Sequence, residues 1–105
     1  MTDFSYSVEP NGAHAIGHLA GEIDLATIAA LEAAIEATEE ACGAGDVVLD
    51  MSGVTFIDSS GLRVLVTAND RQDASDRRLI IRNPSVSVLR VLEITGLLST
   101  MNIDE

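Results

Sequence analysis

The sequence predicts an α/β fold in which a mixed β-sheet with an N-terminal hairpin is covered by helices. An alternating segment followed by a turn stands at the start, short apolar runs rich in β-branched residues recur further along, and segments of helical periodicity separate those runs. Buried strands joined through helices pair in parallel with right-handed crossovers, whereas a hairpin pairs antiparallel. Because 105 residues is the usual size of one domain, we expect a single domain over residues 1–105.

The hairpin is predicted at the start of the chain. Residues 4–8 alternate apolar and polar side chains, as a half-buried strand does. Pro10-Asn11-Gly12 is typical of a turn, because Asn and Gly tolerate positive φ angles. Residues 13–20 are expected to form the return strand, although Gly17 weakens the pattern.

An amphipathic helix is predicted after the hairpin, with Asp24 as its N-cap and Gly43 and Gly45 ending it. Its buried stripe is expected to consist of the apolar residues at helical spacing, namely Leu25, Ile28, Leu31, Ile35 and Cys42. Cys42 is the only cysteine, so an intrachain disulfide is excluded. We expect its side chain to be a small buried hydrophobe rather than a reactive thiol.

The second half of the chain repeats the strand and helix pattern. Short buried strands are predicted at residues 47–49 and 79–81, with Ser52-Gly53 leading out of the first and a strand-like run at 55–57. A second helix is expected from Asp58 to about Ser75, with an inner face of Leu62, Leu65, Val66 and Asn69. Pro84 is expected to open a third helix that carries Val88, Leu89, Leu92 and Glu93 and ends at Gly96, before a short strand within residues 98–103.

The charge balance restricts the partners that the protein can have. The chain carries 17 acidic and 6 basic side chains, all six of them Arg, for a net charge of -11. Residues 1–50 hold ten of the acids and no base, whereas residues 51–105 hold seven acids and all six Arg. Such a surface repels nucleic acids and anionic membranes, so we expect neither as a partner. It favours a basic or neutral protein partner, although solubility alone also explains the charge.

Location is predicted from what the sequence lacks. The N-terminus has no basic and apolar signal pattern, and no apolar run approaches the length of a membrane span. We therefore expect a cytoplasmic protein.

The most distinctive local chemistry lies at Ile57-Asp58-Ser59-Ser60-Gly61-Leu62, where an apolar run breaks directly into a helix. The first N–H groups of a helix lack partners within it, and the macrodipole adds positive partial charge there. A serine at this place can cap the helix, or can carry a phosphate opposite free N–H donors. The alternative is a plain N-cap formed by Asp58 or Ser59, with no further function.

Enzyme sites are not supported by the sequence. A nucleophile elbow needs Gly at position 57, where this chain has Ile57, and no histidine follows to act as a base. The absence of Lys excludes a phosphate-binding loop of the Gly-Lys type. His14 and His18 lie four residues apart on a strand, about 13 Å, which is too far to share one metal ion. We therefore expect no catalytic residues, no metal and no cofactor.

The order of its motifs resembles that of the STAS domains of the anti-sigma factor antagonist (anti-anti-sigma factor) family. The matching segments are Gly21-Glu22-Ile23-Asp24, residues 47–54, Asp58-Ser59-Ser60-Gly61-Leu62 and Thr95-Gly96-Leu97. The resemblance implies a single STAS-like domain. It also implies a partner, an anti-sigma factor with serine kinase activity, that phosphorylates Ser59, with Ser60 as the alternative acceptor. It also implies a serine phosphatase that acts on the phosphorylated form. The partner-binding residues implied are Glu22, Asp24, Asp58, Ser59, Ser60, Gly61 and Leu62.

The function expected from this resemblance is a phosphorylation-switched binding protein. Its unphosphorylated form captures the anti-sigma factor and thereby releases a sigma factor. The alternative is a STAS sensory or scaffold module that binds a nucleotide, lipid or transporter partner without a switch. The sequence leaves the oligomeric state open.

Overall fold

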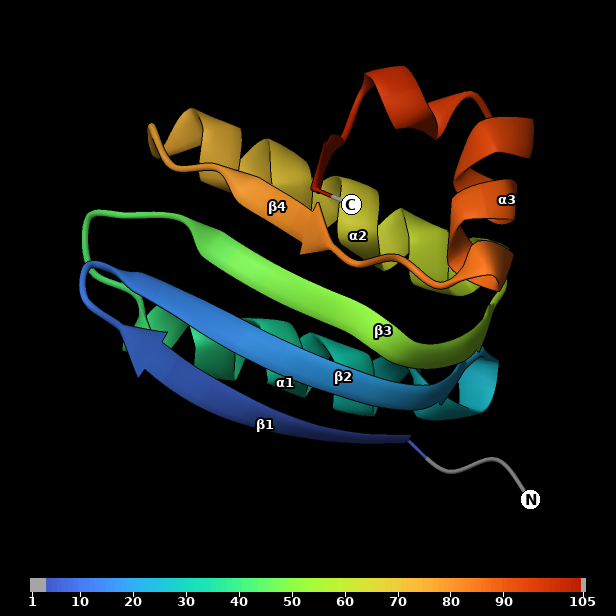
Figure 1. Ribbon diagram of the computed structural model, residues 1–105, viewed down its shortest axis with the longest axis horizontal. Coiled ribbons are helices and arrows are strands. Elements are labelled where there is room, and N and C mark those ends of the chain that lie inside the picture. The colour runs from blue at the N-terminus through green and yellow to red at the C-terminus, as the bar shows by residue number, and fades with distance from the viewer. Residues whose placement is uncertain (1–3, 105) are drawn as a thin grey trace.

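The five-stranded sheet has the order β1-β2-β3-β4-β5 in this computed structural model, which describes residues 4–104 (Figure 1). The strands are β1 (Phe4–Asn11), β2 (His14–Ile23), β3 (Val47–Ile57), β4 (Leu79–Arg82) and β5 (Asn102–Asp104). The helices are α1 (Ile28–Ala41), α2 (Ser59–Ala74) and α3 (Val86–Ile94), with short 3-10 helices η1 (Leu25–Thr27) and η2 (Leu97–Ser99). β1 pairs antiparallel with β2 and the other pairs are parallel, which confirms the predicted mixed sheet.

The hairpin is longer than the sequence pattern predicts. β1 continues through Pro10 to Asn11, so the turn lies at Gly12 and Ala13, where Gly12 has a φ of 64°. The predicted turn at Pro10 is therefore wrong. Pro10 is tolerated because β1 is an edge strand, in which a missing N–H leaves no neighbour unpaired.

β3 is one strand of 11 residues rather than a short strand and a separate run. Its pairing with β2 is irregular at two places, and at each of them β3 has one residue more than β2. One irregularity lies opposite the segment from His18 to Ala20 of β2, and the other lies opposite Gly21 and Glu22. Each bulge resets the alternation of side chains, so that Met51, Val54 and Ile57 all remain buried. A simple period of two could not reveal this continuity.

The helix starts also differ from expectation. Asp24 caps η1, and α1 begins only at Ile28. Leu25, predicted in the buried stripe of the first helix, is 80% exposed because η1 turns it outward. Ser85, rather than Pro84, is the residue directly before α3, and its hydroxyl accepts a hydrogen bond from the Val88 N–H.

The core lies between the sheet and its helices. α1 and α2 lie behind the sheet in Figure 1, and buried residues of all three helices join those of the strands in one cluster. Leu65 of α2 and Leu92 of α3 are completely buried there. Of the residues predicted for the inner faces, Val66, Leu89 and Cys42 are only half-buried and Glu93 is exposed. No helix within residues 4–104 has the length and apolar character needed to cross a membrane.

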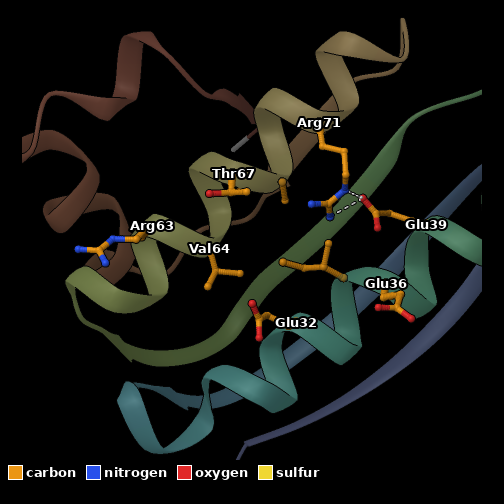
Figure 2. Close-up of a pocket in the computed structure, with 9 residues that line it drawn as sticks. Glu32, Glu36, Glu39, Arg63, Val64, Thr67 and Arg71 are labelled. Atoms are coloured by element: carbon orange, nitrogen blue, oxygen red, sulfur yellow. Dashed lines mark hydrogen bonds and ion pairs between the residues drawn. The ribbon is translucent and has the colours of Figure 1, made fainter.

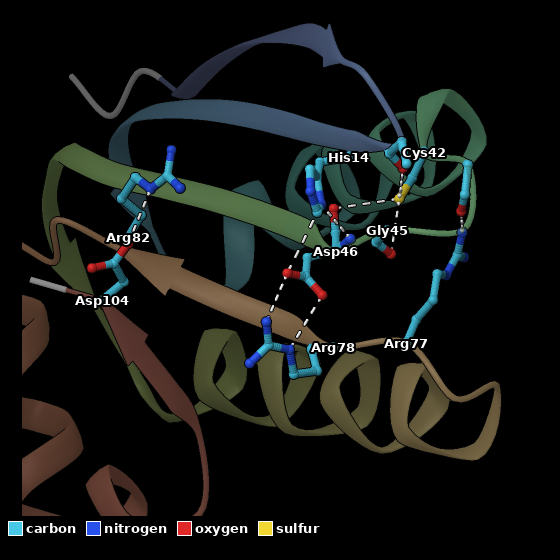
Figure 3. Close-up of polar contacts among 10 residues, drawn as sticks. His14, Cys42, Gly45, Asp46, Arg77, Arg78, Arg82 and Asp104 are labelled. Carbon is cyan, nitrogen blue, oxygen red and sulfur yellow. Dashed lines mark hydrogen bonds and ion pairs between the residues drawn. The ribbon is translucent and has the colours of Figure 1, made fainter.

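The other face of the sheet carries rows of charged side chains across neighbouring strands (Figure 3). Asp46 pairs with Arg78 at 2.9 Å and its backbone N–H donates to His14. His18 contacts Glu9 at 2.8 Å and Asp50 at 3.5 Å. Burial alone would raise the pKa of Asp50, but hydrogen bonds from Ser52 and the adjacent His18 lower it below the ordinary value. Both histidines are thus surface residues within polar rows.

The amino-terminal edge of the parallel strands is joined to the helix ends by a polar network. Glu39 of α1 accepts hydrogen bonds from Arg71 and Gln72 of α2. Arg77 donates to Gln72 and also to the carbonyl of Gly43 (Figure 3). The half-buried Cys42 thiol lies within hydrogen-bonding distance of backbone carbonyls in the same region, such as that of Asp46 at 3.3 Å. Cys42 is therefore only half-buried: it packs against the core as a small hydrophobe, and its thiol also makes polar contacts at the helix end.

Gly17 sets how closely α1 packs on β2, which gives a test of the packing. A Cβ at Gly17 would collide with Thr38 Oγ1 and come within 3.3 Å of Leu49. We expect Gly17→Ala to lower the free energy of unfolding by about 1–3 kcal/mol through overpacking, measured by urea denaturation. Gly43→Ala is the matched control, because the nearest atom to its Cβ would be 3.4 Å away.

A double variant distinguishes overpacking from other effects of Gly17→Ala. Thr38→Ala removes the hydroxyl that the new Cβ meets, so the two changes together should cost less than the sum of their separate costs. Strict additivity would contradict this account of the packing.

Candidate functional site

The site lies where β2 and β3 end side by side. Ile23 pairs with Ile57, and the Asp58 N–H donates to the Ile23 carbonyl over 3.1 Å. The chain after β2 enters η1 and the chain after β3 enters α2, so the segment containing Glu22 and Asp24 lies beside the start of α2. The structure thus brings together the two segments that sequence analysis assigned to one site.

Asp58 is the N-cap of α2. Its Oδ1 accepts hydrogen bonds from the N–H groups of Ser60 at 3.0 Å and Gly61 at 3.1 Å. Its carbonyl accepts from the Leu62 N–H at 3.1 Å. The cap predicted for Asp58 is therefore present, and it occupies the N–H donors that the sequence alone would leave open for an anion.

The two adjacent serines differ in what their hydroxyls contact. The Ser60 hydroxyl donates to Asp58 Oδ1 over 2.6 Å, and Ser60 is half-buried. Ser59 is exposed, and its hydroxyl has no hydrogen-bond partner among residues 4–104. Ser59 is consequently the accessible hydroxyl of the pair.

The pKa of Asp58 is lowered by these contacts. The hydrogen bond from the Ser60 hydroxyl is the main cause, and the backbone N–H groups of Gly61, Ser60 and Leu25 add to it against a smaller opposing effect of burial. Asp58 is therefore a carboxylate at neutral pH. It places a fixed negative charge beside Ser59.

Gly61 and Leu62 support the site but do not form its surface. A Cβ at Gly61 would lie 2.5 Å from Ile23 and 2.9 Å from Ile57, so only glycine lets α2 start this close to the strand ends. Leu62 is 6% exposed and belongs to the core. Neither presents a side chain to solvent, so the role that the structure gives them is to seat the start of α2, and their contact with a partner stays a prediction.

The loop after β2 is held by a reciprocal pair of hydrogen bonds. Asp24 Oδ1 accepts from the Ala26 N–H at 3.0 Å, and the Asp24 N–H donates to Thr27 Oγ1 at 2.9 Å. The Thr27 hydroxyl also contacts the carbonyl of Glu22 at 2.9 Å. Asp24 therefore has a structural role as a cap, which fixes the direction in which the half-buried loop presents its carboxylate.

Two features near this site are not evident from the sequence. Leu25 and Phe56 are exposed apolar side chains at 80% and 47%, close in sequence to Asp24 and Asp58. A groove of about 540 Å³ also separates α1 from α2 (Figure 2). Glu32 and Glu36 line it from α1, and Arg63 lies at its α2 side. The sequence signal for Arg63 is its spacing of four residues from Ser59, because side chains at this spacing are neighbours on a helix.

No metal centre is found in the part of the chain that the structure describes. Within residues 4–104, no three His, Cys, Asp or Glu side chains lie close enough together to hold a metal ion. What remains at the site is a free serine hydroxyl beside a carboxylate, at the exposed start of a firmly seated helix.

Comparison with known proteins assigns this architecture to a family. The STAS domain model matches residues 5–105, so the chain belongs to the STAS domain family. The anti-sigma-B factor antagonist of Staphylococcus aureus is 31% identical over 85 residues, which cover 81% of this chain and 78% of that protein. The family expected from the motifs is thereby confirmed.

Solved structures agree with the fold. A crystal structure of an anti-sigma factor antagonist from Mycobacterium paratuberculosis has a TM-score of 0.85 at 26% identity, covering 97% of this chain and 86% of that one. The unphosphorylated form of the anti-sigma factor antagonist SpoIIAA has a TM-score of 0.75 at 22% identity, covering 96% and 89%. The Bacillus SpoIIAA structure in its phosphorylated form has a TM-score of 0.68, again at 22% identity, and covers 96% of this chain and 92% of that one.

The cap geometry predicts how stability depends on pH near the Asp58 pKa. Because folding lowers that pKa, the cap stabilises the protein fully above the ordinary carboxyl pKa near 4, and the stabilisation is lost as pH falls below it. Asp58→Ala should cost about 1 kcal/mol of unfolding free energy at pH 7 and progressively less below pH 4. Chemical denaturation of both proteins across this range measures the difference. A cost that does not change with pH would show that the carboxylate is not responsible.

Proposed function

We propose that the protein is an anti-sigma factor antagonist whose binding is switched off by phosphorylation of Ser59. In its unphosphorylated form it captures an anti-sigma factor that is also a serine kinase, and so releases a sigma factor. The kinase transfers a phosphoryl group from ATP to the Ser59 hydroxyl, leaving ADP. A serine phosphatase restores the binding form. The protein acts as a binding module in the cytoplasm rather than as an enzyme.

The observation that carries this proposal is the contrast between the two serines. Ser59 is exposed with a free hydroxyl, whereas the Ser60 hydroxyl is held by Asp58 at 2.6 Å. A kinase needs a hydroxyl that it can reach and align with ATP, and Ser59 meets that need without any rearrangement of the cap. Family membership and relatives named as anti-sigma factor antagonists support the same function.

The surface around Ser59 suits capture of a protein partner. Leu25 offers an exposed apolar side chain on the loop after β2, next to Asp24. A protein partner would desolvate an apolar side chain of this kind at the centre of its interface and leave charged ones at the rim. Glu22 and Asp24 contribute charge on the same edge, so a partner with a basic or polar rim fits this surface best.

The switch follows from charge. A phosphate adds about -1.5 to -2 charges at neutral pH. It would lie next to the Asp58 carboxylate, which already carries a negative charge, on a strongly acidic protein. Burying that charge in an interface without a new partner costs several kcal/mol, so phosphorylation disfavours the complex.

Labelling variants test the phosphate acceptor. Incubated with ATP and its cognate anti-sigma factor kinase, the Ser59→Ala protein should remain unlabelled while Ser60→Ala is still phosphorylated. Ser60→Ala is the matched control because it removes a hydroxyl one residue away. Mass spectrometry of the wild-type protein locates the phosphate, and its presence on Ser60 or Ser52 would disprove the assignment.

Titration tests the direction of the switch. We expect phosphorylated protein to bind the anti-sigma factor on the order of a hundredfold or more weakly than unphosphorylated protein, since each 1.4 kcal/mol is tenfold. Isothermal calorimetry of both forms measures the two affinities. Equal or tighter binding after phosphorylation would rule out the proposed switch.

A further inference from the structure

We propose that Arg63 holds the phosphate of phosphorylated Ser59 in an ion pair within the chain. This inference rests on the proposed function, because it describes the state that phosphorylation of Ser59 creates. It gives the switch a second effect. The phosphate adds negative charge, and it also engages the guanidinium of Arg63, the basic residue nearest in sequence to Ser59, in an ion pair.

The helix start cannot supply the donors that a phosphate requires. The Asp58 carboxylate already accepts from the N–H groups of Ser60 and Gly61, and its carbonyl accepts from Leu62. Only the N–H of Ser59 itself is left from the first turn. In this conformation the Ser60 and Gly61 amides are therefore not open to a phosphate, and the dianion needs a side-chain donor.

Arg63 has the position and the freedom to be that donor. It lies four residues after Ser59 on α2, and side chains at this spacing are neighbours, with Cβ atoms about 5–6 Å apart. A helical side chain points toward the N-terminus of its helix, so Arg63 extends back toward Ser59. An acidic group four residues before a basic one is the favourable order for such a pair.

Arg63 is not engaged elsewhere in the described chain. It is exposed and has no hydrogen bond or ion pair with any residue in 4–104. Figure 2 shows its guanidinium near the start of α2, directed away from Glu32 and Glu36 across the groove. Most other arginines are already paired, as Arg71 is with Glu39 and Arg78 with Asp46, and Arg90, which is not, lies on α3. Arg63 is thus available without breaking an existing contact.

Guanidinium and phosphate match in geometry as well as charge. The planar fork of Arg donates two parallel N–H bonds to phosphate oxygens, whereas Lys offers only a point charge. We therefore expect Arg63 to bind the phosphate through direct hydrogen bonds rather than through long-range electrostatic attraction alone.

The test installs phosphoserine at position 59 during translation, so that no kinase or partner is involved. The pH midpoint of the ³¹P chemical-shift titration should be higher in Arg63→Gln than in the unsubstituted phosphoprotein, by roughly 0.3 or more. Arg63→Lys should retain part of the difference. Arg90→Gln is the matched control, since Arg90 is also exposed without a partner in residues 4–104 but lies on α3.

A second readout detects the contact directly. The Arg63 Nε–H proton signal should shift when Ser59 is replaced by phosphoserine, and that of Arg90 should not. Equal ³¹P midpoints in the phosphoprotein and its Arg63→Gln variant would overturn the inference. That result would leave the proposed function intact, because the labelling of Ser59 and the partner titration are measured on the protein without Arg63 substitutions.

Discussion

The close approach of α2 to the ends of β2 and β3 is the constraint on which the site depends. Gly61 makes it possible, because any side chain there would press on Ile23 and Ile57. With the helix seated in this way, the Asp58 N–H bonds to the Ile23 carbonyl and the Asp58 side chain caps the first turn. The cap leaves Ser59 as the first residue of the helix, turned outward. The lack of a side chain at Gly61 therefore allows the helix start that leaves the Ser59 hydroxyl exposed.

Much of the fold was predictable because its signals are local. The alternation of residues 4–8, the apolar run at 47–49 and the periodicity after Asp58 each depend on a single element, and the mixed sheet follows from their order. The errors arose where a contact with another element overrides the local pattern. Pro10 remains in a strand because its strand is at the sheet edge, and β3 continues through Ser52 and Gly53 because bulges against β2 restore the buried alternation.

The site could be located from the sequence but not described in detail. The motif around Asp58 and Ser59 identified the position, since capping residues and an apolar strand end are visible in one dimension. The sequence could not distinguish Ser59 from Ser60, because the difference depends on which hydroxyl the Asp58 carboxylate accepts from. Nor could it show that Leu25 faces solvent, because the helical spacing predicts both Leu25 and Leu62 on buried faces and only Leu62 is buried. Such distinctions are made by tertiary packing.

The distribution of charge explains why a single phosphate can act on this surface without a change in backbone structure. Arginines from the second half of the chain neutralise acids of the first half at sites remote from Ser59, as Arg71 does for Glu39 and Arg78 for Asp46. Near Ser59 the Asp58 carboxylate is already fixed by its hydrogen bonds, and its lowered pKa keeps it charged. Protonation of Asp58 therefore cannot relieve, at neutral pH, the repulsion between its carboxylate and a phosphate added at Ser59. Because the helix start is also held by the core through Gly61, the added charge alters the electrostatic surface while the elements that present it stay in place.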